Sequence, residues 1–117
     1  MDVEIDLYSG RRNPVFGLPP DTGDALVARI AALPPAPPGA APLQDLGYRG
    51  FRVTGGGPAA EFTEIVVSGG VVVVRDRGGA ERLLHDAGRS VERSLADLAA
   101  TRVHPDDMLL LRRELNG

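Results

Sequence analysis

Residues 64–75, read as EIVVSGGVVVVR, constrain the fold more than any other stretch. They hold seven valine or isoleucine residues in twelve positions, interrupted by Gly69 and Gly70. β-branched side chains suit a pleated strand better than a helix, and paired glycines supply the positive φ values that a two-residue turn requires. The stretch therefore predicts a central β-hairpin at 64–75.

Both faces of this predicted hairpin are apolar. Alternation places Ile65 and Val67 on one face of the first strand and Val66 on the other, and residues 71–74 are all valine. Because neither face is polar, both must be covered. We expect helices of the chain on one face, and a protein partner or a second copy of the chain, forming a homodimer, on the other.

Alternation and turn residues predict about five strands, at 2–8, 48–54, 64–68, 71–75 and 81–85. Residues 80–99 could instead form one long helix. We prefer a second hairpin, because Gly78-Gly79 repeats the first turn, Gly88 would weaken a helix interior, and Asp86 is a good cap for a helix from residue 87. The acids of the first strand need a facing cation, and Arg52 is the candidate.

Three amphipathic segments predict helices. The first follows Asp21, its expected cap, and ends before Pro34; the second follows Asp86; the third begins at Pro105 and carries acids in its first turn. Residues 34–43 hold five prolines in ten positions and are interpreted as a connector. Residues 1–117 are therefore expected to form a single α+β domain, an antiparallel sheet of about five strands packed with three helices.

Composition narrows the function. The net charge is −3 and the arginines are interspersed with acids, so we expect no nucleic-acid partner. The absence of cysteine excludes disulfides and thiolate metal sites. No stretch of 18 apolar residues predicts a membrane span, and the acidic start does not resemble a secretion signal, so we expect a cytoplasmic protein. Arginine as the sole cationic residue is typical of a GC-rich bacterial genome.

One loop offers a candidate ligand site, formed by Tyr8, Ser9, Arg11, Arg12 and Asn13. Its ordinary interpretation is a tight turn after the first strand, because glycine, serine and asparagine are turn residues. The alternative is a clamp in which the arginine forks bind a carboxylate or phosphate.

The sequence presents no catalytic constellation. His85 and His104 lack the spacing of a metal site, and no serine lies in a nucleophile motif, so no metal or cofactor is expected. We interpret the chain as a small binding or accessory module that acts through protein–protein contact, and more readily as a non-enzyme than an enzyme. The alternative is a binder of small anionic molecules, or a minimal enzyme, that uses the 9–13 loop or a pocket between sheet and helices with Tyr8, Arg11 and His85.

Overall fold

A six-stranded antiparallel sheet, in the order β2-β1-β3-β4-β5-β6, forms one layer of the molecule. The computed structural model describes residues 1–8, 11–44, 47–56 and 60–116. The strands are β1 (Asp2–Asp6), β2 (Val15–Gly17), β3 (Gly50–Thr54), β4 (Phe62–Ser68), β5 (Val71–Asp76) and β6 (Glu81–His85). The helices are α1 (Pro20–Ala31), the short 3-10 turn η1 (Ala87–Arg89), α2 (Ser90–Ala99) and α3 (Pro105–Asn116). The predicted α+β class, with an antiparallel sheet and three α-helices, is confirmed.

Both predicted hairpins are present. Strands β4 and β5 pair in antiparallel fashion around Gly69 and Gly70, whose φ values are 61° and 90°, as the two-residue turn requires. The second hairpin joins β5 to β6 through the four residues 77–80. Here the Asp76 carboxylate accepts hydrogen bonds from the backbone N–H groups of Gly78 and Ala80, both at 2.9 Å.

Strand β2 is the element that the count of about five strands omitted. It pairs with β1 through Val3 and Phe16. The strand has only three residues, so it is too short to display the period-two alternation on which the prediction depended. It forms one edge of the sheet.

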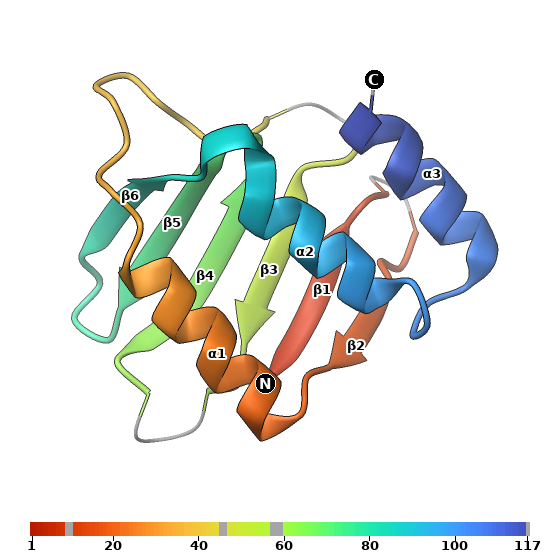
Figure 1. The fold of residues 1–117 in the computed structure, drawn as a ribbon, viewed down its shortest axis with the longest axis horizontal. Coiled ribbons are helices and arrows are strands. Elements are labelled where there is room, and N and C mark those ends of the chain that lie inside the picture. The colour runs from red at the N-terminus through yellow and green to blue at the C-terminus, as the bar shows by residue number, and fades with distance from the viewer. Residues whose placement is uncertain (9–10, 45–46, 57–59, 117) are drawn as a thin grey trace.

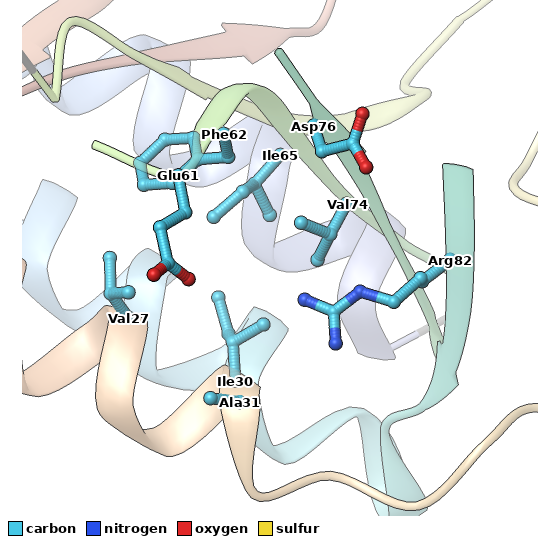
Figure 2. Close-up of a pocket in the computed structure, with 9 residues that line it drawn as sticks. All are labelled: Val27, Ile30, Ala31, Glu61, Phe62, Ile65, Val74, Asp76 and Arg82. Carbon is cyan, nitrogen blue, oxygen red and sulfur yellow. The ribbon is translucent and has the colours of Figure 1, made fainter. Parts of the chain in front are cut away.

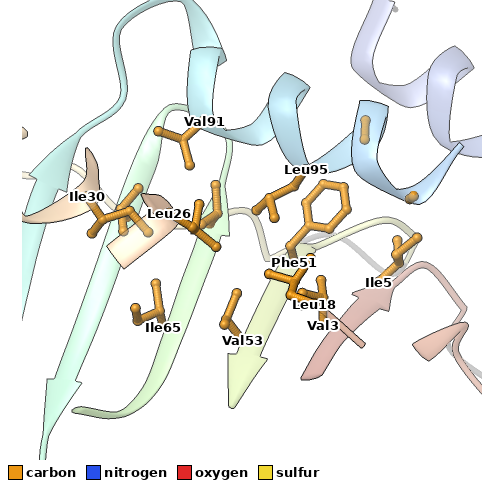
Figure 3. Packing of buried hydrophobic residues seen from close by; sticks show 14 of the residues in the cluster. Val3, Ile5, Leu18, Leu26, Ile30, Phe51, Val53, Ile65, Val91 and Leu95 are labelled. Atoms are coloured by element: carbon orange, nitrogen blue, oxygen red, sulfur yellow. The ribbon is translucent and has the colours of Figure 1, made fainter. Parts of the chain in front are cut away.

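The helices lie together on one face of the sheet, with α1 and α2 in front of the strands and α3 beside α2 (Figure 1). Side chains that alternate toward this face form the core, including Ile65 and Val67 of the central hairpin. Phe51 of β3 and Leu95 of α2 are fully buried at its centre, and Figure 3 shows them packed between sheet and helix. The predicted division of the hairpin between two faces is therefore observed.

The starts of two helices differ in detail from the prediction. Helix α1 is preceded by Pro19, which makes no side-chain cap bond, and Asp21 lies inside the first turn, so Asp21 is not the cap. Proline at N1 needs no N–H partner, which explains why the helix begins at Pro20, two residues earlier than a cap at Asp21 predicts. Helix α2 begins at Ser90 instead of residue 87, and Arg89, with a φ of 55°, occupies its N-cap position. The Asp86 carboxylate still accepts from the N–H groups of Val91 and Glu92 at 2.8 and 3.1 Å.

The proline-rich connector contacts the sheet directly. The N–H of Ala36 donates to the Leu83 carbonyl at 2.9 Å, and the N–H of His85 donates to the Pro34 carbonyl at 2.7 Å. Further along, the N–H of Leu43 donates to the Ser68 hydroxyl at 2.9 Å. The connector thus runs along β6 and returns to the turn end of β4.

Gly50 should tolerate a side chain far less than Gly39, although both have positive φ values, 109° and 84°. A Cβ added at Gly50 would lie 2.3 Å from the Val67 carbonyl oxygen, whereas one added at Gly39 meets nothing within 4 Å. We expect Gly39→Ala to lower the free energy of unfolding by about 1 kcal/mol. Gly50→Ala should lower it by about 3 kcal/mol or more, because backbone strain and overpacking add.

Urea denaturation followed by circular dichroism measures both changes in the free energy of unfolding. Equal losses in the two variants would contradict the close approach of β3 and β4 at Gly50.

Candidate functional site

The face of the sheet opposite the helices carries a row of apolar side chains. Val66, Val73 and Leu83 are aligned across β4, β5 and β6 by the strand register. The two valines are half-buried, and Leu83 is 37% exposed. Within residues 1–8, 11–44, 47–56 and 60–116, no helix covers this face, and we call it the open face (Figure 1).

A ladder of alternating charges lies beside this apolar row. Arg52 Nε is 3.3 Å from Glu64 Oε2, Arg75 Nη1 is 3.6 Å from Glu64 Oε1, and Arg75 Nη2 is 2.8 Å from Glu81 Oε2. The hydrogen bond that Arg75 donates to the Glu81 carboxylate raises the pKa of Arg75, so its guanidinium stays charged. From β3 to β6 the charges run positive, negative, positive, negative.

Arg52 lies across the sheet from the acids of β1, as predicted, because it pairs in register with Glu4. Its ion pair, however, is to Glu64 on the other neighbouring strand. The first-strand acids find other partners: Glu4 accepts from Asn13 Nδ2 at 2.9 Å, and Asp6 lies 3.2 Å from Arg49.

Asn13 closes the loop that the sequence singled out. Its Oδ1 accepts from the backbone N–H groups of Leu7 and Tyr8, at 3.1 and 2.9 Å, while its amide nitrogen reaches Glu4. These bonds fit the turn interpretation, because an asparagine side chain here replaces backbone partners. Ser9 of the candidate site lies outside the described residues.

Tyr8 and Arg11 are directed toward α3. The Tyr8 hydroxyl donates to the Asp107 carboxylate, and this bond raises the pKa of Tyr8. The Arg11 guanidinium lies 4.0 Å from the centre of the Tyr8 ring and 3.8 Å from Asp107. Arg12 is exposed and has no hydrogen bond or ion pair with any described residue. Anion binding by this loop stays a prediction, with Arg12 the arginine available for it.

A buried carboxylate, which the sequence did not reveal, joins the central hairpin to α2. Glu92 is completely buried and accepts from the Tyr48 hydroxyl, from the Gly69 N–H at 2.9 Å, and from Arg89 at 2.9 and 2.8 Å. Burial, reinforced by the adjacent carboxylate, raises the pKa of Tyr48, so the phenol stays neutral and donates. With every acceptor site used, Glu92 stabilises the fold.

A cavity of about 360 Å³ lies between α1 and the strands β4, β5 and β6. Figure 2 shows its polar residues, Glu61, Asp76 and Arg82, around an apolar floor. Tyr8, Arg11 and His85, the residues predicted to serve a pocket between sheet and helices, do not line it. One sequence signal was available: Arg82 shares the inward face of β6 with buried Leu84, an unusual position for arginine.

Both histidines are exposed. Among the described residues, no group of three or more His, Cys, Asp or Glu side chains is arranged to hold a metal ion. The described helices include none with the length and apolar character needed to cross a membrane. No protein-family model, curated protein or solved structure matches this chain.

Tyr48→Phe should destabilise the protein by about 1.5–3 kcal/mol at neutral pH, because a hydrogen bond to a buried carboxylate is lost. In the native protein the raised pKa of Tyr48 keeps the phenol neutral, whereas in the unfolded chain it ionises near pH 10. Stability from Tyr48 is therefore present below about pH 10 and lost above it, by up to about 1.4 kcal/mol per pH unit.

Urea denaturation from pH 7 to 11 tests this dependence. The alkaline loss of stability should be shallower in Tyr48→Phe than in the native protein. Tyr8→Phe is the comparison, since the pKa of Tyr8 is raised through a hydrogen bond made near the surface, and its effect on the slope should be smaller. Identical slopes in all three proteins would contradict the buried Tyr48–Glu92 contact.

Proposed function

We propose that this chain is a binding module that acts through protein–protein contact at the open face, and that its partner is a second copy of itself. The observation that carries the proposal is the alternating ladder of Arg52, Glu64, Arg75 and Glu81 next to an apolar row. A sheet face with apolar side chains in its middle is covered in most proteins, and here the helices occupy the other face.

The order of the charges makes the ladder complementary to its own copy. A twofold axis between two facing sheets, parallel to the strands, reverses the strand order, so that β3 faces β6 of the second copy and β4 faces its β5. Glu64 then faces Arg75 of the second copy, because the two residues are in register. Arg52, which is in register with Val66, faces Leu83 of the second copy, one row from its Glu81. The two central charges of each copy thus meet their opposites, as a homodimer with twofold symmetry requires.

The same axis brings the apolar rows together. Val66 faces Val73 of the second copy, and the reverse contact follows by symmetry. Burial of these side chains supplies affinity, at about 25 cal/mol for each Å² of apolar surface removed from water. The ladder, which is partly exposed and contributes little to stability within one chain, supplies orientation.

Val73→Asp should convert a dimer into a monomer, because it places a carboxylate at the centre of the contact. Leu109→Asp is the matched control, since Leu109 is 65% exposed on α3 and lies away from the open face. Size-exclusion chromatography with light scattering at micromolar concentration gives the mass of each. A native protein that is monomeric under these conditions would overturn self-association.

Reversing all four ladder charges tests whether the partner is a second copy of the chain or an unrelated protein. One variant combines Arg52→Glu, Glu64→Arg, Arg75→Glu and Glu81→Arg. Its charges still alternate, with opposite signs, so the variant should still form homodimers. It should not mix with the native chain, because residues 64 and 75, which face each other across the contact, would then carry like charges. Subunit exchange between differently tagged chains measures this, and free mixing would contradict the proposed geometry.

A further inference from the structure

The cavity between α1 and the sheet lies on the opposite side of the sheet from the open face. Its floor is formed by apolar side chains of α1 and of the central hairpin: Val27, Ile30, Phe62, Ile65 and Val74. Its volume of about 360 Å³ is in the range of small-molecule sites, which combine apolar walls with a few polar groups.

Arg82 is brought to the cavity by the register of the sheet. It pairs with Val74, and both side chains are directed toward the helices. Figure 2 shows its guanidinium extended into the cavity, toward Ile30. The guanidinium makes no hydrogen bond or ion pair with any residue that the structure describes.

Glu61 approaches the same space from the other side. It immediately precedes β4, and Figure 2 shows its carboxylate above Val27 and Ile30. Within the described chain it also has no hydrogen-bond or ion-pair partner. Asp76 contributes a second negative charge, with one oxygen committed to the turn and directed away from Glu61.

Glu61 and Arg82 thus border the same apolar cavity with opposite charges, yet they do not form an ion pair with each other. Surface charges of opposite sign pair readily elsewhere in this chain, as the ladder on the open face shows. A ligand between Glu61 and Arg82 would satisfy both if it carried a cation and an anion. The apolar floor below them requires that the rest of the ligand be hydrocarbon.

We infer that this cavity binds a small zwitterion with an apolar body, of the class of free amino acids with aliphatic or aromatic side chains. The carboxylate would accept two parallel hydrogen bonds from the Arg82 fork. The ammonium group would pair with the Glu61 carboxylate. The side chain would lie on Ile30 and Phe62. This site is independent of the contact proposed for the open face.

Isothermal titration calorimetry with free leucine and phenylalanine tests the inference on the full chain. N-acetyl-leucine lacks the cation and leucinamide lacks the anion, so each should bind roughly tenfold to a hundredfold more weakly than leucine. Arg82→Gln and Glu61→Gln should weaken leucine binding by a similar factor. Arg113→Gln and Glu114→Gln, exposed on α3, are the matched controls and should bind as the native protein does.

Measuring each analogue with each variant identifies which charge of the ligand contacts Arg82 and which contacts Glu61. Arg82→Gln should not weaken leucinamide further, and Glu61→Gln should not weaken N-acetyl-leucine further, because each analogue already lacks the matching group. Ala31→Trp, at the exposed rim, should block binding sterically while melting temperature shows that the fold is intact.

Absence of binding by both amino acids at millimolar concentration would overturn the inference, as would binding that none of the three cavity variants changes. Light scattering on the same samples keeps the two proposals apart, because loss of self-association through Val73→Asp should leave the calorimetric affinity for leucine unchanged.

Discussion

The pairing of β4 with β5 is the interaction on which the rest of the structure depends. Its valine-rich strands occupy the middle of the sheet, and their register determines which side chains meet the helices and which do not. The Glu92 carboxylate accepts a hydrogen bond from the N–H of Gly69 in the turn. It also accepts a hydrogen bond from the Tyr48 hydroxyl and forms an ion pair with Arg89. The hairpin, the approach to β3 and the start of α2 are therefore fixed by one group.

Local chemistry explains what could be predicted from the sequence. Paired glycines, runs of β-branched residues and a proline at a helix start act within a few residues, so both hairpins, three helices and the α+β class were foreseeable. Strand β2 could not be predicted, since three residues are too few to show the alternation of a strand. Glu92 could not be predicted either, because its burial depends on Tyr48 and Gly69, which are distant in sequence.

The candidate sites, like Glu92, depend on contacts between residues that are distant in sequence. The arginines near Asn13 form a compact motif that suggested an anion clamp, yet Asn13 closes its own loop and Arg11 stacks on Tyr8. The cavity instead joins Glu61 and Arg82, which are separated by an entire hairpin and become neighbours only through strand pairing. A motif in the sequence consists of residues close together along the chain, whereas a binding site gathers residues from several elements.

The contact between the proline-rich connector and β6 has a consequence for assembly. Unpaired strand edges invite other chains to extend a sheet, which leads to fibres and precipitation. Here backbone groups of Leu83 and His85 on the outer side of β6 are already bonded to residues 34–36, and the opposite border, β2, offers only three residues after Pro14. Lateral growth is blocked at one border and short at the other, which steers association toward closed pairs rather than open-ended polymers.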